Sequence, residues 1–539
     1  MGALSNAVHA GLLIGAGSNE YQVVRVSPDV IELVRTQNGT ERQIPRKVLD
    51  LLLQALAAGR ISIADTGRDG RDPHNHVFDR LGITHDKYIM GYDSTIEKLC
   101  EYCLSQLKAR SDTAPEPDRA FVDDLNGSGV RVDDLLVTRL LSSLLAKRFL
   151  LLTGLSGSGK TKLAQALAVW LAAQPRSEPR YALLAVGANW TSKEDLLGYP
   201  DALNAGVFRA KPALELLLRA KEDPKRPYFL ILDEMNLSHV ERYFSDFLSA
   251  MESGEEITLH EGGEWQTEQE TPVPEKMVIP ANLFVIGTVN VDETTYMFSP
   301  KVLDRANVIE FRAEAETVSG FLGSPSEVDL EALAGKGDEF AEASAAAARM
   351  RLGADFELEA DVQAALKAEL EVFFAVLADH EAEFGFRTAK DVARFVHFFL
   401  ELSGEQGAGS TEEGTGQADS QLQAPGSERL RRAMDAVVMQ KILPKLHGSE
   451  RKLGPVLRGL GELCHGRDGT PESRLARARA AAENQPEAGS PLAKKPDELF
   501  AECRKDEFRQ ALRYPLSFEK IVRMLRKLRR DGFASFAEA

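Results

Sequence analysis

The segment from Gly154 to Thr161, which reads GLSGSGKT, carries the clearest chemical signal in the chain. It fits the pattern G-x-x-x-x-G-K-[S/T], in which a glycine-rich loop curls around phosphate groups with its N–H groups pointing inward. Glycine suits a backbone that must turn sharply and approach a ligand closely, and a helix N-terminus adds a favourable dipole. The pattern predicts a phosphate-binding loop whose binding residues are Gly154, Ser156, Gly157, Ser158, Gly159, Lys160 and Thr161.

Two side chains of this loop have specific expected roles. We expect Lys160 to reach the β- and γ-phosphates of a nucleoside triphosphate, and the hydroxyl of Thr161 to bind Mg²⁺. The alternative is a glycine-rich turn that matches the pattern by accident. An apolar segment before the loop and a helical pattern after it argue against that alternative.

A second signal is an apolar run that begins at Tyr228 and ends in two carboxylates, Asp233 and Glu234. Such a run predicts a buried strand that delivers both carboxylates to its C-terminal edge. We expect Asp233 to bind the nucleotide by holding Mg²⁺ through its water shell. Glu234 is expected to polarise the attacking water, which suits hydrolysis better than transfer to a bound acceptor. The alternative is a strand that simply meets a charged turn.

A third apolar run, residues 283–290, ends in the polar residue Asn290. Because this run follows the strand with the two carboxylates, we expect Asn290 to hold the lytic water or to contact the γ-phosphate. An ordinary asparagine at a strand end is the alternative. Glu234 and Asn290 are thus the two catalytic candidates that the residue pattern itself supplies.

These motifs need a framework that brings strand ends together. Between residues 130 and 312, apolar strand segments alternate with helical segments, which is typical of an α/β core. The strand segments are apolar throughout, as in parallel sheets that are buried on both faces. We expect strands over 149–154, 181–186, 228–234 and 283–290, with a helix over 160–173.

The order of these motifs, followed by Arg305, resembles that of AAA+ ATPases. The resemblance implies an AAA+ P-loop NTPase core, a parallel sheet flanked by helices, with a helical lid after it. It also implies that Arg305 reaches the γ-phosphate bound by the neighbouring subunit, so that hydrolysis depends on assembly of a ring, which we expect to be a hexamer. A surface salt bridge between Arg305 and Asp304 is the alternative.

Two further segments narrow the resemblance to the McrB family, the motor subunits of modification-dependent restriction systems. Residues 190–199 read WTSKEDLLGY, and residues 233–252 are similar to the family pattern DEINRANLSK…LME. The resemblance is strong over 140–312 and extends weakly into residues that resemble the lid. There, Arg387 is either a sensor-2 arginine that contacts the nucleotide or a solvent-exposed helix residue.

The sequence departs from the McrB family at one signature. The family has M-N-x-x-D just after the third strand, whereas residues 289–293 read VNVDE. Because the family prototype prefers GTP and this signature is altered, we leave the nucleotide open between ATP and GTP. The sequence has no convincing D…E-x-K nuclease motif, and the family resemblance implies a separate McrC-like nuclease as partner, with DNA as the target.

The expected function is therefore an AAA+ motor that hydrolyses ATP or GTP to drive translocation or activation of a partner nuclease in anti-phage DNA restriction. The main alternative is a MoxR-like AAA+ ATPase that remodels protein complexes. A third class is a regulatory switch, which has little use for a residue such as Glu234.

Changes in composition along the chain predict four regions. Residues 1–112 are expected to form a small N-terminal α+β domain that recognises the target, and residues 113–130 a linker. The AAA+ core is expected over 131–315. Residues 316–539 are expected to form the helical lid and a C-terminal helical region, with flexible insertions near 404–428 and 466–498.

The overall charge limits the kinds of partner. The 539 residues include 65 Lys and Arg against 82 Asp and Glu, a net charge of −17. Attraction of nucleic acid or anionic lipid to the whole surface is excluded, so such contact needs a local basic patch. No apolar run approaches the ~20 residues that span a bilayer. We expect a cytoplasmic protein that does not contact a membrane.

Several weaker features have two interpretations each. The cysteines at 100, 103, 464 and 503 either converge on zinc or are buried thiols, and His74 and His76 form a polar-loop metal site only if other ligands join them. The basic helix expected over 517–533 either contacts phosphates or packs its apolar face and leaves its basic face in water. Trp190 and Tyr199 either contact a threaded strand or a partner, or pack in the core.

Overall fold

The computed structural model describes residues 13–14, 21–26, 30–35, 41–45, 117–130, 132–172, 178–291, 296–312, 329–403, 425–466, 469–487 and 489–539. The chain packs as two compact units, residues 1–115 and residues 116–539. The described part of the first unit is an antiparallel sheet in the order β1-β2-β3-β4, with strands Leu13–Ile14, Tyr21–Val26, Val30–Arg35 and Glu41–Pro45. Any helix of the expected α+β domain lies outside the described residues.

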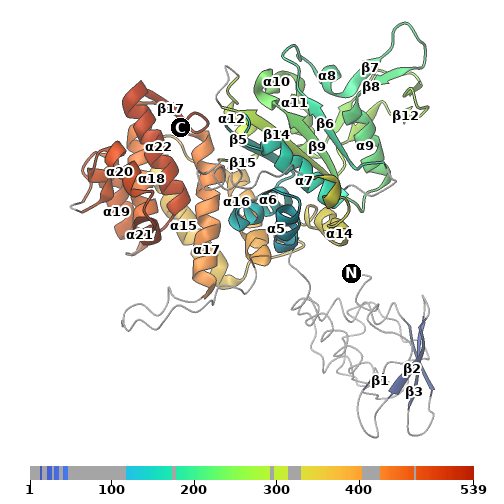
Figure 1. The fold of residues 1–539 in the computed structure, drawn as a ribbon, viewed down its shortest axis with the longest axis horizontal. Helices are drawn as coiled ribbons and strands as arrows, with labels where there is room; N and C mark the ends of the chain where they lie inside the picture. The colour runs from blue at the N-terminus through green and yellow to red at the C-terminus, as the bar shows by residue number, and fades with distance from the viewer. Residues whose placement is uncertain are drawn as a thin grey trace. The chain divides into compact units, whose positions relative to one another are not determined.

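The second unit is built on a five-stranded parallel sheet in the order β15-β5-β14-β9-β6 (Figure 1). Four of its strands are the segments that their apolar sequence predicts. β14 lies between β5 and β9, although it follows both of them in the chain. The strands are β5 Phe149–Gly154, β6 Tyr181–Ala185, β9 Tyr228–Asp233, β14 Leu283–Asn290 and β15 Asn307–Glu310.

Helices cover both faces of this sheet, because successive residues of a strand point to opposite sides. Leu150 and Leu152 of β5 belong to a buried cluster with α5, α6 and α7, whereas Phe149 and Leu151 belong to a second cluster with α8 to α11. The helices are α5 Pro117–Gly127, α6 Asp134–Ala146, α7 Lys160–Ala172, α8 Lys193–Leu197, α9 Pro212–Glu222, η3 Met235–Leu237, α10 Val240–Tyr243, α11 Ser245–Ser253 and α12 Pro300–Leu303.

Four short antiparallel strand pairs occur in residues 116–539 of the described chain, three near the sheet and one, β16–β17, beside α18 and α22. Two of them, β7–β8 and β11–β12, are joined because Val207 bridges to Gln266. The pairs are β7 Gly198–Pro200 with β8 Phe208–Ala210, β10 Glu256–Thr258 with β13 Lys276–Val278, β11 Trp265–Gln266 with β12 Pro272–Val273, and β16 His447–Ser449 with β17 Phe533–Ser535.

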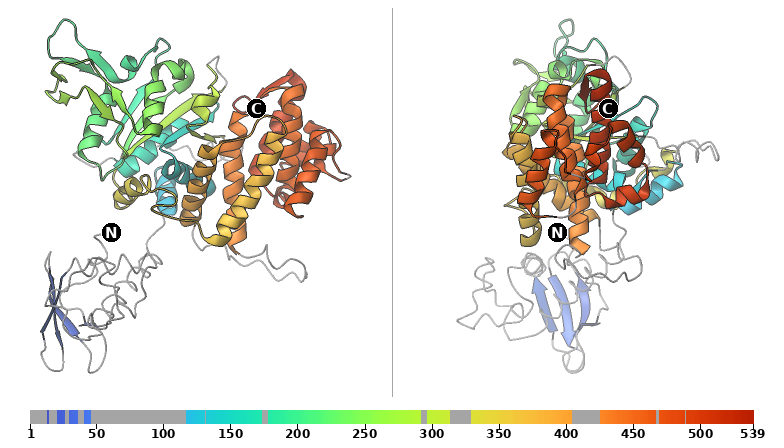
Figure 2. Two further views of the ribbon diagram at one scale, coloured as in Figure 1. Left: turned by 180° about the vertical axis from the view of Figure 1, so that it is seen from behind. Right: turned by 90° about the vertical axis from the view of Figure 1, so that its left-hand side faces the viewer.

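The rest of the unit is helical, and its C-terminal helices gather on one side of the sheet (Figures 1 and 2). There, α18 packs against both α19 and α22. The segments are η4 Glu331–Leu333, α14 Asp338–Ala347, α15 Ala360–Ala378, α16 Phe386–Leu402, α17 Pro425–Val437, the π-helix η5 Val438–Ile442, η6 Leu443–Lys445, α18 Glu450–His465, α19 Pro471–Ala482, η7 Pro491–Ala493, α20 Pro496–Glu502, α21 Asp506–Ala511 and α22 Pro515–Asp531.

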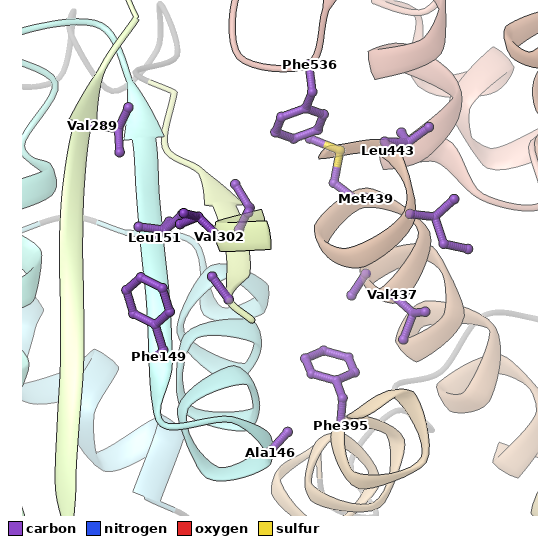
Figure 3. Close-up of a cluster of buried hydrophobic side chains, with 14 of the residues drawn as sticks. Ala146, Phe149, Leu151, Val289, Val302, Phe395, Val437, Met439, Leu443 and Phe536 are labelled. Carbon is purple, nitrogen blue, oxygen red and sulfur yellow. The ribbon is translucent and has the colours of Figure 1, made fainter. Parts of the chain in front are cut away.

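One buried apolar cluster joins the sheet to the helical region, which is why residues 116–539 form a single unit. Figure 3 shows this junction, where side chains of β5 and α12 face side chains of α16, α17, η5 and η6. The side chains labelled there include Phe149, Leu151, Val302, Phe395, Val437, Met439 and Leu443.

Two segments contain helices that the sequence analysis did not expect. Residues 117–127 of the expected linker form α5, because Phe121 and Leu125 are fully buried and Phe121 packs on Trp170 with ring centroids 4.9 Å apart. The expected flexible insertion near 466–498 contains the ordered helix α19. This helix is polar in composition, but its Arg474 is buried and pairs with Glu369 of α15 at 2.6 Å. Residues 404–424 of the other expected insertion lie outside the described residues.

Candidate nucleotide site

The glycine-rich loop connects buried β5 to the first turn of α7, as its sequence predicts. Gly159 has φ +99°, a left-handed conformation that favours glycine. Gly154 is needed for a different reason, since a Cβ atom there would lie 2.2 Å from the main-chain oxygen of Phe311. The residues just after β15 thus press directly against the base of the loop.

The Lys160 side chain folds back against this loop. Its Nζ donates hydrogen bonds to the main-chain oxygens of Gly154 at 3.0 Å and Leu155 at 2.7 Å. The lysine is buried, while Ser156 and Gly157 are exposed. The loop therefore presents exposed backbone above a buried ammonium group.

A chain of short hydrogen bonds links the loop to β9. The hydroxyl of Thr161 donates to Oδ1 of Asp233 at 2.6 Å, and the hydroxyl of Thr288 donates to the same oxygen at 2.6 Å. The backbone N–H of Glu234 donates to the Thr288 hydroxyl at 3.0 Å. Our sequence analysis missed Thr288, although it stands two residues before Asn290 and so on the same face of β14.

Glu234 and Asn290 face each other beside this chain. The Asn290 amide donates to Oε1 of Glu234 at 3.1 Å, and the amide of Asn236 donates to the main-chain oxygen of Asn290 at 3.1 Å. Glu234 has φ +53°, a conformation that costs energy in a residue other than glycine. Strained backbone of this kind clusters at functional sites.

The hydroxyl of Thr161 and the carboxylate of Asp233 suit Mg²⁺ that is also bound by phosphate and water, and they are too few to hold a metal ion by themselves. Mg²⁺ keeps several waters and is usually bound through one or two carboxylates plus phosphate oxygens. Thr161 and Asp233 supply one hydroxyl and one carboxylate, already 2.6 Å apart. Among the described residues, no group of three or more His, Cys, Asp or Glu side chains could hold a metal ion.

Arg305 and Arg387 meet at a different place, at the end of α11. Nε of Arg305 donates to Oε2 of Glu252 at 2.6 Å, and Arg387 forms an ion pair with the same carboxylate. The expected alternative, a salt bridge from Arg305 to Asp304, is not what forms. Asp304 instead pairs with Arg387 at 3.5 Å and with Lys445.

The charges around Asp304 shift its ionisation. Burial opposes ionisation of Asp304, but Lys445, Lys441 and Arg387 outweigh burial and lower its pKa. Lys441 is itself buried beside these groups. Burial lowers the pKa of Lys441 to about 7, and the nearby Lys147 adds to that shift.

The aromatic residues, cysteines and histidines that the sequence left open lie in different places. Trp190 packs edge-on against Tyr243 with ring centroids 5.3 Å apart, which matches core packing, whereas Tyr199 is 49% exposed on β7. The thiols of Cys464 and Cys503 are free and buried, and burial raises the pKa of both. The residues Cys100, Cys103, His74 and His76 lie outside the described residues.

The basic helix α22 packs its apolar face, as one of its two expected interpretations has it. Its apolar residues Ile521, Met524 and Leu528 are buried as expected. However, part of its basic face is covered too: Lys520 is buried, Arg523 is mostly buried, and they bind Glu310 at 2.9 and 2.6 Å. Burial alone would raise the pKa of Glu310, but these two cations lower it to about 2.

A large cavity lies away from the loop. It has a volume of about 850 Å³ and lies between α15 and α16, lined mainly by apolar side chains such as Leu370, Phe374 and Phe384. No residue of the hydrogen-bonded network at the sheet edge lines it. Among the described residues, no helix combines the length and the apolar character needed to cross a bilayer.

Two comparisons with known proteins bear on this chain. A family model described as a domain of unknown function (DUF8727) matches residues 344–533, most of the helical region. The chain is also 26% identical over 164 residues to the type IV methyl-directed restriction enzyme EcoKMcrB subunit of Escherichia coli (strain K12). This similarity covers 30% of the chain and 34% of that protein, about a third of its length.

Proposed function

We propose that the chain is a nucleoside-triphosphate hydrolase of the AAA+ type that cleaves ATP or GTP. One observation carries the proposal: short hydrogen bonds join Thr161, Asp233 and Glu234 through Thr288 at one edge of the sheet. In open parallel sheets, ligands bind in the crevice beyond the carboxyl ends of the strands. The sheet order supports the AAA+ assignment, because β14 brings Asn290 next to Gly154.

In this proposal each side chain of the edge has one task. The loop backbone and Lys160 bind the triphosphate, and Thr161 and Asp233 hold Mg²⁺, which neutralises charge on the phosphate oxygens. The carboxylate of Glu234 accepts a hydrogen bond from the attacking water and so polarises that water. The amide of Asn290 fixes the carboxylate of Glu234 and so orients that water.

The proposal also includes a ring, a hexamer, in which Arg305 of one subunit contacts the γ-phosphate bound by the next. The charges near Arg305 support an anion from another chain. Three partly exposed basic side chains meet two carboxylates there: Arg305, Arg387 and Lys445 with Glu252 and Asp304. A phosphate group would offset this excess of positive charge. Arg387, which shares Glu252 with Arg305, is a second candidate for the same phosphate.

We further propose that the motor serves DNA restriction, driving translocation or activation of an McrC-like nuclease. The support is the similarity to a subunit of a methyl-directed restriction enzyme. Residues 1–112 are then the region that recognises the target.

A protein-remodelling ATPase of the MoxR type is the second candidate, and one observation favours it. The segment 261–275, which contains the β11–β12 pair, exposes five glutamates and has no basic residue: Glu261, Glu264, Glu268, Glu270 and Glu275. This surface repels nucleic acid and suits a protein partner.

The proposal is tested by phosphate release from the purified chain supplied with ATP or GTP and Mg²⁺. The Glu234→Gln variant keeps the shape of the side chain and removes the carboxylate, so it should bind nucleotide and fail to hydrolyse it. Glu222→Gln, an exposed glutamate at the end of α9, is the control and should keep full turnover.

Two outcomes decide the proposal. Phosphate release by the wild type but not by Glu234→Gln supports it, and normal turnover in that variant removes the role of Glu234. Stimulation of release by DNA favours restriction, whereas stimulation by a protein partner alone favours remodelling.

A further inference from the structure

Lys441 lies at the junction of the sheet and the helical region, beneath the turn that carries Arg305. It is buried, with 3% of its side chain exposed. Its Nζ donates to the main-chain oxygens of Asp304 at 3.1 Å and Ala306 at 2.8 Å. These are the two carbonyl groups that flank Arg305.

The third proton of the ammonium faces the carboxylate of Asp391, at 3.2 Å from Oδ2. A lysine ammonium group has three donors, so the two carbonyl oxygens and Asp391 satisfy all of them. Asp391 lies in α16, and Lys441 lies in η5, so both side chains come from the helical region.

Two more lysines strengthen this arrangement. Lys147, just after α6, donates to the main-chain oxygen of Asp304 at 3.1 Å and pairs with Asp391. Lys445 pairs with the carboxylate of Asp304 and donates to the hydroxyl of Thr388 at 3.0 Å. We call Lys147, Lys441, Lys445, Asp304 and Asp391 the lysine clamp.

The backbone around Lys441 is specialised. Val438–Ile442 is a π-helix, a rare form that frequently occurs at functional sites. The residue before Lys441 also reaches the sheet unit, since Gln440 accepts from Nε of Arg139 at 2.7 Å and donates to the Ser143 hydroxyl at 2.6 Å. The apolar neighbours Met439 and Leu443 point into the junction (Figure 3).

We propose that Lys441 is a positioning residue for Arg305, and that the lysine clamp transmits the position of the helical region to the turn that carries this arginine. This inference rests on the proposed function, in which Arg305 acts on a neighbouring subunit's nucleotide. A shift of α16 and η5 moves Asp391 and Lys441 together, and with them the carbonyl groups on both sides of Arg305.

The contacts of Lys441 are separate from those that bind nucleotide in the same chain, so the positioning of Arg305 can be lost without loss of nucleotide binding. The bonds of Lys441 go to the Arg305 turn and to Asp391, whereas the loop, Asp233 and Glu234 are joined through Thr161 and Thr288. Loss of the clamp should therefore leave nucleotide affinity unchanged and lower turnover. A displacement of about 1 Å in a catalytic group can cost about 100-fold in rate.

The test uses Lys441→Met, which keeps the length of the side chain and removes its donors. We expect turnover to fall by about 100-fold while nucleotide affinity changes little. The melting temperature should fall as well, because Lys441→Met removes the donor to the buried main-chain oxygen of Ala306. Lys452→Met, an exposed lysine in α18, is the matched control and should behave as wild type. If Lys441→Met fails to fold, Asp391→Asn removes the carboxylate that pairs with both Lys441 and Lys147, and the same assay is used.

Mixing of variants distinguishes a positioning role from a structural one. Lys441→Met chains are co-expressed with Glu234→Gln chains, which lack hydrolysis but supply an intact Arg305. In a random ring, about a quarter of the interfaces pair an intact Glu234 with a well-placed Arg305, so turnover should return in part. Co-expression with Arg305→Ala should not restore it.

Each result has one meaning. Wild-type turnover in Lys441→Met overturns the inference. The inference is also overturned if co-expressed Glu234→Gln restores turnover to Arg305→Ala but not to Lys441→Met. If Glu234→Gln fails to relieve even Arg305→Ala, the proposed action of Arg305 between subunits fails instead.

Discussion

The edge of the sheet and the Arg305 turn are built in opposite ways. At the edge, short side chains at the ends of strands bond directly, as Thr161 and Thr288 do with Asp233 at 2.6 Å. At the turn, long side chains reach in from distant parts of the chain, and Lys441 binds a carbonyl group 137 positions away. The first arrangement depends on local strand geometry, and the second depends on how the helical region packs.

This difference assigns different consequences to the two regions. A substitution at the edge should change nucleotide binding or cleavage inside one subunit. A substitution near the turn should spare binding and change what one subunit does for another, or change the stability of the junction.

The largest effect is expected at the edge. Lys160→Ala removes the buried ammonium group, so nucleotide affinity should fall below detection in an assay with a fluorescent ATP or GTP analogue. Lys162→Ala, an exposed lysine two residues later in α7, is the control and should bind normally. Tight binding by Lys160→Ala would show that the loop does not hold phosphate.

A large loss of stability is expected at Glu310, on the strand that follows the Arg305 turn. Glu310→Gln removes the carboxylate that pairs with Lys520 and Arg523 and leaves them the main-chain oxygen of Ala539, which should cost about 3 kcal/mol near neutral pH. The check is chemical unfolding of both proteins over a range of pH.

The pH dependence of this loss has a definite sign. The pKa of Glu310 is about 2 in the folded protein, below its ordinary value of 4.5. Its stabilising contribution is therefore complete above about pH 4.5 and declines as the pH falls towards 2. The stability difference between wild type and Glu310→Gln should shrink over that interval, and a constant difference would contradict the ion pair.

A smaller effect is expected at Thr288. Thr288→Val keeps the shape of the residue and removes the hydroxyl that joins Asp233 to Glu234, so turnover should fall by about tenfold, with about 1 kcal/mol of lost stability. Val289→Thr is the control: Val289 follows Thr288 in β14 and lies on the opposite face of the strand, so this change affects stability and leaves the hydrogen bonds of Asp233 and Glu234 intact. Full turnover in Thr288→Val would show that the network is not needed for catalysis.

The sequence allowed the sheet to be predicted well and the ion pairs poorly. Apolar runs predicted β5, β6, β9 and β14, and the glycine-rich segment predicted the turn into α7, because these elements follow from local composition. The helix α5 was missed because its three buried apolar residues, Phe121, Val122 and Leu125, stand among acidic and polar residues.

The partners of the charged residues could not be predicted, because each is set by tertiary packing. Glu252 lies 53 positions from Arg305, and Glu310 lies 213 positions from Arg523. The alternative considered for Arg305 was a surface salt bridge to the adjacent Asp304, but in the structure Asp304 pairs with Lys445 and Arg387. Thr288 was recognisable in principle, since it shares a strand face with Asn290.

The most direct test of the central claim, that nucleotide is cleaved between adjoining copies of this chain, combines two inactive variants. Glu234→Gln and Arg305→Ala should each release almost no phosphate alone, and together they should regain up to about a quarter of wild-type turnover. If each variant is inactive alone and the co-expressed pair remains inactive while forming mixed assemblies, the account is contradicted.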